Sequence, residues 1–309
     1  MTPDVSALTT AFVQFGGDVV RKKTSQWDLQ NDFFFHRNVT APQVLPKLAA
    51  QGNPRPYRDT EDFTGNDPVF TDRTLTAYVG KWDFQMSYES LRNTYLSASK
   101  NGKLDPSSTP LHQYILEQYT NEFFSQLYDN TVGLGVYNSS GTTAAAICDG
   151  LRTLIAAAIT ATTLTPITTG AIASTDAVTK VETFVTGLPA WMRQKGFKIF
   201  CSYAIFDKYK AHYRTLNAFG FQRSENGRYQ LDGIKGYMEP RGWMGTSSRL
   251  IAVPDVPVTD ANYNLHMGTN DEAIMVYPTV NLNIIKMRYM YPLGIQIADL
   301  AGIFVNDQT

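Results

Sequence analysis

The stretch TLTAYVGKWDFQMS, residues 74–87, is the part of the sequence from which the fold can be worked out. Its second half alternates between polar and apolar side chains, which is the pattern of a half-buried strand. The polar set is Lys81, Asp83 and Gln85, and the apolar set is Trp82, Phe84 and Met86. The first half alternates in the opposite phase, with Leu75, Ala77 and Val79 apolar. The phase changes at Gly80, which predicts a bulge or bend there.

The two halves of this stretch are expected to bury their apolar faces against different surfaces. Fourteen extended residues span about 46 Å, which is longer than an ordinary strand, so the strand must lean on something. We expect Trp82, Phe84 and Met86 to pack on the body of their own chain, against a long helix. The first half is expected to bury its apolar side chains against a different surface. The alternative is an ordinary bulge inside the sheet of one domain.

The segment before this strand, residues 51–72, has the composition of a loop or hairpin tip. It holds three prolines, two glycines and many charged residues. Mixed charge on a projecting loop suits complementary pairing with a neighbouring chain. The residues predicted to make contacts between subunits are Arg55, Arg58, Asp59, Glu61, Asp62, Asp72, Arg73, Leu75, Ala77 and Val79.

Residues 105–133 give the strongest helix pattern in the chain. Thr109 is a suitable N-cap, and Pro110 suits the first helical position. Apolar side chains then recur every four residues, and Gly133 ends the pattern. A helix of this length would be roughly 30–35 Å long, which is long for a globular domain.

The rest of the chain alternates helix and strand and then becomes rich in strands, so the sequence predicts an α+β protein. A helix begins near Ser174 and is broken at Pro189. A short buried strand over 198–203 and a second helix over 204–213 follow. The last fifty residues are β-rich, with a turn expected at Tyr291-Pro292-Leu293-Gly294.

The composition excludes several classes of protein. Hydrophobic residues make up 43% of the 309 residues and charged residues 18%, so a sizeable core is expected and disorder is not. The net charge of −1 gives no overall attraction for nucleic acid or for an acidic membrane. No apolar run approaches the ~18 residues that a membrane-spanning helix needs. Two cysteines do not make a disulfide framework.

No group of residues in the sequence predicts a catalytic or metal site. The four histidines are far from one another and from both cysteines, so no local metal-ligand spacing exists. The glycine-rich GLGVYNSSG at 133–141 lacks the ending of a phosphate loop and is interpreted as a helix stop and loop. The carboxylates are dispersed. The sequence therefore predicts a protein that is not an enzyme and binds no cofactor or metal.

The order of these segments resembles the major capsid protein of tailed double-stranded DNA bacteriophages, the Hong Kong 97-type fold. LTAYVGKWDFQMSYESLRNTYL at 75–96 resembles the returning strand of that family's extended loop, and the close RYMYPLGIQIADLAGIFVN resembles its final strand pair. The resemblance implies an N-terminal arm (1–52), an extended loop (53–88), a peripheral domain with a spine helix (89–138 and 259–292) and an axial domain (139–258 and 293–309).

The resemblance also implies a function and partners. The chain would self-assemble as hexamers and pentamers into an icosahedral shell around double-stranded DNA, bound without sequence specificity, and it would be made in the cytoplasm of the host bacterium. A portal, a separate scaffold protein and decoration proteins would be further partners, and no membrane is involved. The basic cluster Arg21, Lys22 and Lys23 is a candidate DNA-facing group, although a solvated cluster is the simpler interpretation.

Two departures from the family pattern lead to further expectations. Only about fifty residues precede the expected loop, so no large cleaved leader region is expected. The part of the loop over 53–73 has arginine but no lysine, so no covalent crosslink between subunits is expected.

Three other classes of protein remain open from the sequence. An encapsulin-like nanocompartment shell has the same fold, and its nucleic acid content would separate the two. An α/β hydrolase or transferase with a dispersed site would be a monomer or small oligomer. A portal or tail component is a third alternative, which the β-rich end of the chain disfavours.

Overall fold

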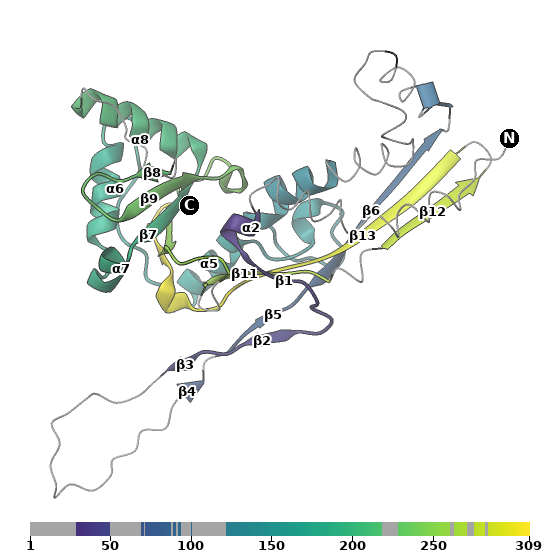
Figure 1. Cartoon of the computed structure of the whole chain (residues 1–309), viewed down its shortest axis with the longest axis horizontal. Coiled ribbons are helices and arrows are strands. Elements are labelled where there is room, and N and C mark those ends of the chain that lie inside the picture. Colours follow the sequence, from purple (N-terminus) through teal and green to yellow (C-terminus); the bar gives the residue numbers. More distant parts are fainter. Residues whose placement is uncertain are drawn as a thin grey trace, which may run out of the picture.

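Three parts make up the chain in the computed structural model: a lobe of helices and strands, a long sheet that extends away from it, and a projecting hairpin (Figure 1). The structure describes residues 29–49, 69–70, 72–87, 89–90, 92–93, 100, 122–217, 228–259, 263–270, 275–281 and 284–309. Mixed helix and strand content agrees with the α+β class predicted from the sequence.

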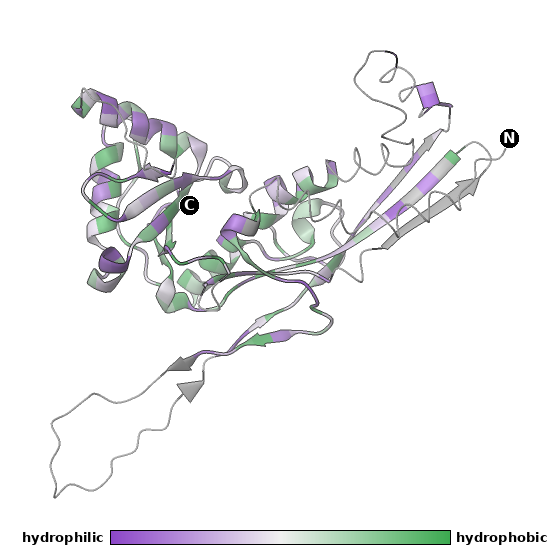
Figure 2. Cartoon of the chain, viewed as in Figure 1, coloured by the Kyte–Doolittle hydropathy of each residue, from purple (hydrophilic) through white to green (hydrophobic). Residues whose placement is uncertain are grey.

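The lobe is built on a five-stranded sheet in the order β14-β10-β7-β9-β8. These strands are β7 (Phe197–Cys201), β8 (Tyr229–Gln230), β9 (Gly236–Pro240), β10 (Ile251–Pro254) and β14 (Phe304–Val305). Figure 1 places helices α6 (Ala177–Thr186), α7 (Ala190–Lys195) and α8 (Tyr203–Leu216) around the outer side of this sheet. Hydrophilic residues gather on the outermost of them, α8 (Figure 2).

Strands β7 and β10 are buried on both faces because they separate two apolar clusters. Phe197, Ile199 and Cys201 of β7 pack with the helices of the lobe, whereas Phe200 packs with the centre of the molecule. In β10, Ala252 packs with the helices of the lobe, and Ile251 packs with the centre of the molecule. A strand covered on both sides carries a continuous apolar run, which is why these two segments are so hydrophobic in the sequence.

The helix–strand–helix segment follows its local sequence closely. The apolar positions predicted for the first helix are buried, among them Val178, Val181 and Phe184. Pro189 separates α6 from α7, as predicted, and forms the N-cap of α7. Gly196, with φ of 107°, ends α7, and the Ser202 hydroxyl accepts a hydrogen bond from the Ile205 amide to cap α8.

Strand β13 (Ile284–Ile297) is the longest strand of the described residues and joins the lobe to the far end of the molecule (Figure 1). Strand β6 (Tyr78–Ser87) pairs with one of its edges. Strands β11 (Leu265–Gly268) and β12 (Met275–Asn281) pair with the other edge, one after the other. Strand β1 (Phe34–His36) adds to β11 in parallel.

The turn expected at 291–294 is wrong, because β13 runs through these residues without a break. On the edge shared by β12 and β11, pairing with β12 ends at Met290 and pairing with β11 begins at Gly294. Pro292 lies between these two paired regions. Proline has no amide hydrogen, and at this position no partner strand on that edge needs one. Tyr291 and Leu293 on either side of it are buried.

The stretch 74–87 is two strands, and the change of phase has a different cause from the one expected. Strand β5 (Arg73–Leu75) ends before Thr76, and β6 begins at Tyr78. Pairing with β13 continues through Gly80 without a bulge, so the expected bend at Gly80 is wrong. A side chain at Gly80 would lie 2.7 Å from the Ile147 side chain, so close packing is the reason for glycine there.

The break at Thr76 and Ala77 depends on Gly294 of β13, which contacts the backbone at Thr76. A Cβ atom at Gly294 would lie 2.1 Å from the Thr76 carbonyl oxygen, so only glycine lets the two backbones approach this closely. The chain can therefore leave the long sheet at this point and enter the hairpin.

The projecting hairpin pairs β2 (Gln43–Leu45) with β5, and β3 (Leu48–Ala49) with β4 (Val69–Phe70). Its outgoing strand begins inside the range predicted for the arm, 1–52, and its returning strand ends before β6. The expected loop boundaries, 53–88, therefore do not match the strand pairing. The cause is that β6 finds its partner in β13 and not in the hairpin.

Further helical segments lie in the centre of the molecule (Figure 1). Of the long helix predicted over 105–133, the described part is residues 122–126, followed by a wider turn over Leu127–Val132. The Ala-rich stretch forms α5 (Leu151–Thr160), and the short helix α2 (Leu29–Asp32) contributes Leu29 to the same apolar cluster. Short 3-10 turns cover Ala144–Ala146, Gly242–Met244 and Leu300–Gly302. Within the described part, no helix has the length and apolar character needed to cross a membrane.

Candidate assembly surfaces

An apolar cluster holds the root of the hairpin to its own chain. Leu75 is fully buried with Val39 and Leu45, and Ala77 and Ala298 pack against the three. Leu75 was expected to face a neighbouring subunit, and this expectation is wrong because no part of its side chain is exposed. Its apolar character instead stabilises the junction between hairpin and sheet.

Polar contacts tie both strands of the hairpin root to the end of β13. On the outgoing side, Lys47 forms an ion pair with Asp299. On the returning side, Arg73 Nη2 donates to Gln296 Oε1 at 3.0 Å, and Gln296 Nε2 donates to the Thr74 carbonyl at 2.8 Å. Burial lowers the pKa of Arg73 from its ordinary value. Arg73, predicted to contact a neighbour, therefore has a partner in its own chain.

The other predicted contact residues lie in different settings. Asp72 is exposed, and Ala77 is half-buried. Val79 projects from β6 with 56% of its surface exposed, as a contact residue requires. The remaining loop residues, Arg55, Arg58, Asp59, Glu61 and Asp62, lie outside the described residues, and so does the basic cluster Arg21, Lys22 and Lys23.

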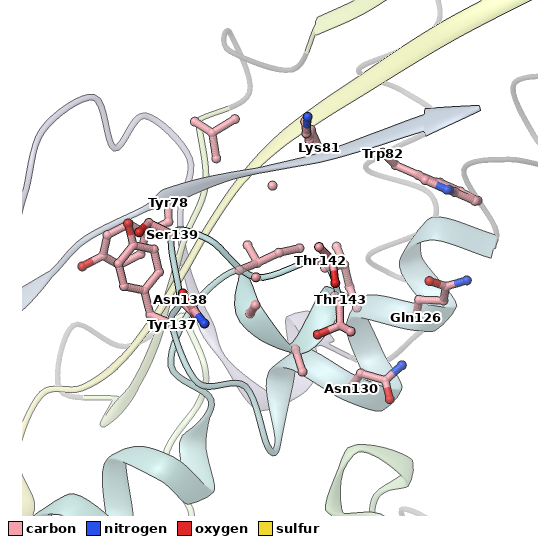
Figure 3. A pocket seen from close by; sticks show the side chains of 18 of the residues that line it. Tyr78, Lys81, Trp82, Gln126, Asn130, Tyr137, Asn138, Ser139, Thr142 and Thr143 are labelled. Carbon is pink, nitrogen blue, oxygen red and sulfur yellow. The ribbon is translucent and has the colours of Figure 1, made fainter. Parts of the chain in front are cut away.

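A groove of about 1170 Å³ opens between β6 and the loop that follows the central helix (Figure 3). Trp82 lies over this helix with its ring centroid 5.9 Å from that of Phe123, which agrees with the packing predicted for it. Tyr78 stacks on Tyr137 at 3.8 Å across the other end of the groove. Its floor carries neutral polar side chains, including Gln126, Asn130, Asn138, Ser139, Thr142 and Thr143.

Exposed apolar side chains gather in the loop beside this groove. Leu134, Val136 and Tyr137 are 50%, 56% and 41% exposed. By its sequence alone, the segment 133–141 is interpreted as a helix stop and loop. The sequence itself contains a sign of a surface role. Large apolar residues such as Leu134, Val136 and Tyr137 are unusual in a loop of glycine, serine and asparagine.

A buried polar network joins α2 to the lobe. The Asp32 carboxylate accepts hydrogen bonds from Arg241 Nε at 2.7 Å and from Trp243 Nε1 at 3.0 Å. Arg241 also donates to Glu239, and Arg228 links Glu239 to Asp255. Burial alone would lower the pKa of Arg241, but the hydrogen bond to Asp32 and the attraction of the Asp32 and Glu239 carboxylates together outweigh burial, so the pKa lies above its usual range. These contacts fix where the segment before β1 enters the fold.

The described residues offer little for covalent or metal chemistry. Cys148 and Cys201 are free and buried, and burial raises the pKa of both thiols to about 12, so neither is a thiolate at neutral pH. Within the described part of the chain, no three His, Cys, Asp or Glu side chains form a possible metal site.

Comparisons by sequence find no relative. No family model matches the chain, and no curated protein matches it.

Comparisons by structure find capsid proteins along nearly the whole chain. The chain is similar to a protein of the satellite phage P4 procapsid that includes the size determination (Sid) protein, with a TM-score of 0.55 and 10% identity over 94% of this chain and 97% of that chain. It is similar to the capsid of Myoviridae phage XM1, with a TM-score of 0.53 and 9% identity over 90% of both chains. For the capsid of an empty GTA particle, the TM-score is 0.51 and the identity 10%, over 91% of this chain and 89% of that chain. The chain therefore has the α+β fold of these capsid proteins, the Hong Kong 97-type fold.

Proposed function

We propose that this chain is the major capsid protein of a tailed double-stranded DNA bacteriophage. The observation that carries the proposal is the likeness to the P4 procapsid protein, which covers 94% of this chain and 97% of that chain. A match of this extent leaves little of the chain for an added domain with another activity.

The hairpin is the feature of the chain that best fits a shell protein. Its root is fixed to the chain by Leu75 and by the contacts of Lys47 and Arg73. Beyond the root it projects away from both the lobe and the long sheet (Figure 1). A projecting hairpin with a fixed root can reach a neighbouring subunit at a defined angle, and closed shells require such defined angles.

The contact surfaces between subunits follow from this proposal. The charged residues predicted in the loop, Arg55, Arg58, Asp59, Glu61, Asp62 and Asp72, would pair with a neighbour, and Val79 would contribute an apolar contact. The groove between β6 and the 133–147 loop, with exposed Leu134 and Val136 beside it, would be covered in the assembled shell. Burial of these apolar side chains would favour association.

The finer partners are part of the same proposal. The subunit would form hexamers and pentamers of an icosahedral shell in the virion, together with a portal, a separate scaffold protein and decoration proteins. The shell would enclose double-stranded DNA without reading its sequence. The net charge of −1 suits a wall that does not attract the DNA, which a separate motor would drive in. No chemistry is required of the subunit.

Recombinant expression followed by electron microscopy tests the function. Shells, tubes or hexamers are the expected products. A monodisperse monomer at high concentration would contradict the proposal. The nucleic acid content of particles from infected cells then separates a phage capsid, which holds genome-length DNA, from a nanocompartment, which holds a protein cargo.

A further inference from the structure

Two histidines from distant parts of the sequence are hydrogen-bonded to each other beside the hairpin root. His36 Nε2 lies 2.7 Å from His266 Nδ1, and the two rings stack with centroids 5.0 Å apart. They come from the parallel strands β1 and β11. One imidazole must donate and the other must accept, so the bond requires that the accepting ring carries no proton on that nitrogen.

The surroundings of the pair disfavour positive charge. His266 is 5% exposed, and Phe34 packs its ring against both imidazoles. Burial and the neighbouring His36 lower the pKa of His266 to about 4, against an opposing effect of the Tyr263 backbone. Burial also lowers the pKa of His36.

Among the described residues, the carboxylates closest to the pair in the fold already have cationic partners and are not left to neutralise an imidazolium. Gln296 lies opposite His266 on β13, and its side-chain oxygen accepts from Arg73. Arg37, the residue after His36, adds a further positive charge at the surface. The carboxylates on the adjoining elements already have cationic partners, which are Arg241 for Asp32 and Lys47 for Asp299.

The pair holds the segment that leads into the hairpin. After His36, the chain stays on β11 through hydrogen bonds from Thr269 N to the His36 carbonyl, at 2.8 Å, and from Val39 N to the Thr269 carbonyl, at 3.1 Å. The outgoing strand β2 begins at Gln43, only a few residues later. Loss of the pairing between residues 34–39 and β11 would therefore also destabilise the start of β2, one of the two strands of the hairpin root.

We propose that His36 and His266 form an acid-sensitive clamp, which holds residues 34–39 on β11 when the pair is neutral and releases them when both rings are protonated. For the assembled shell this rests on the proposed function, because only there would a freed hairpin change contacts between subunits. In the isolated subunit the clamp is a property of the fold alone.

The direction of the pH dependence follows from the lowered pKa values. The released state takes up a proton near the ordinary value of 6.5, whereas the clamped state resists it until about pH 4. The stabilising effect of the clamp is therefore complete above pH 6.5 and is lost progressively as the pH falls towards 4. Each linked proton changes the opening equilibrium by up to about tenfold per pH unit in this window.

Hydrogen exchange of the unassembled subunit, followed by mass spectrometry, tests the clamp. Protection of the peptide covering 33–39, corrected for intrinsic exchange, is expected to fall at least about tenfold between pH 7 and pH 5. The peptide covering β7, residues 197–201, serves as the internal reference and is expected to keep its protection. His266→Gln is expected to abolish most of the acid response, whereas His212→Gln, which removes an imidazole from α8, is expected to retain it.

Two outcomes would overturn the clamp. One is unchanged protection of 33–39 in the wild-type subunit between pH 7 and pH 5. The other is the same acid response in His266→Gln as in the wild type. If the variant does not fold, proton NMR titration of the wild-type imidazoles decides, because titration of both rings near 6.5 contradicts the clamp. These measurements use the subunit alone, so a failure to form shells would bear on the proposed function and not on the clamp.

Discussion

Asp32 and Arg241 lie 209 positions apart in the sequence and form a buried ion pair, with Arg241 Nε 2.7 Å from Asp32 Oδ2. The same carboxylate accepts from Trp243, and the Asp32 carbonyl accepts from the Tyr263 hydroxyl at 2.7 Å. Asp32 is fully buried and so is the next residue, Phe33. A four-residue helix has almost no stability of its own, so these contacts are what hold α2 in place.

Asp32→Asn tests how much of the fold depends on this pair. The change keeps the size of the side chain but leaves Arg241 without one of its two carboxylate partners. We expect the free energy of unfolding to fall by about 3 kcal/mol, the lower end of the range for breaking a buried pair, because Glu239 remains. Urea denaturation of the unassembled subunit measures it.

Asp83→Asn is the matched control for this prediction. It makes the same chemical change in the pair between Asp83 and Arg288, which is exposed on the long sheet. An exposed pair contributes little, so no measurable loss is expected. Equal losses in the two variants would show that burial of the Asp32 pair has no special effect.

Leu75→Ala is expected to destabilise the subunit itself. Leu75 is fully buried between Val39 and Leu45, so the change would leave a cavity and cost about 2–5 kcal/mol. Thermal or chemical unfolding of the monomer measures the loss. Val79→Ala, on the exposed part of β6, is the control and should leave monomer stability unchanged while weakening assembly. A stable Leu75→Ala monomer that fails only in assembly would restore the expectation drawn from the sequence.

Gly294→Ala is expected to disturb the point where the chain leaves the sheet. The added methyl group would meet the Thr76 carbonyl at 2.1 Å, and a backbone atom cannot move aside without changing the angle of the hairpin. We expect a loss of about 1–3 kcal/mol in stability and misassembled particles in electron micrographs.

Gly80→Ala provides the comparison within the same sheet. Its methyl group would meet the end of the Ile147 side chain, which can change rotamer, so a smaller loss is expected. A larger loss of stability in Gly80→Ala than in Gly294→Ala would show that the close approach of Gly294 to Thr76 does not determine the geometry of the junction between hairpin and sheet.

Trp82→Ala is expected to weaken the contact between the long sheet and the central helix. The Trp82 ring lies over Phe123 and is partly buried in the central cluster. Because the ring is only partly buried, a loss of about 2–3 kcal/mol is expected, below the usual value for a core tryptophan. Chemical denaturation checks it, with Lys81→Ala, exposed on the same strand, as a neutral control.

Deletion of residues 55–72 is expected to separate folding from assembly. The hairpin root is held by contacts at Lys47 and Arg73–Leu75, which lie outside the deleted segment. The shortened subunit should therefore unfold at nearly the wild-type denaturant concentration but form few or no shells, as seen by sedimentation. An unfolded monomer would instead show that the segment belongs to the core of its own chain.

Local patterns in the sequence predicted the parts of the fold that local physics determines. The apolar stripe of α6 and the break at Pro189 were predicted correctly because each depends on residues within a few turns. The role of Leu75 was predicted wrongly, since alternation shows that a strand has two faces but not what covers each face. The sequence predicts a turn at Pro292, whereas the structure has a continuous strand there. The gap between two partner strands that accommodates this proline depends on residues far away in the sequence.

The contacts at the hairpin root could not have been predicted from the sequence. Lys47 and Asp299 are 252 positions apart, and Arg73 and Gln296 are 223 apart. Nothing in the composition around either residue distinguishes these pairs from the other charged residues of the chain. The contact of His36 with His266 could not be predicted for the same reason, because the two residues are 230 positions apart in the sequence.

The continuity of β13 has a mechanical consequence. Its hydrogen bonds to β6 run side by side along most of its length, in an antiparallel register without a bulge. Tension applied along the strands would load all of these bonds together in shear, whereas tension across them would break them one at a time. A wall built from such subunits would resist stretching best along the direction of β13, so the orientation of this strand relative to the pressure-bearing surface would decide how much load each subunit can withstand.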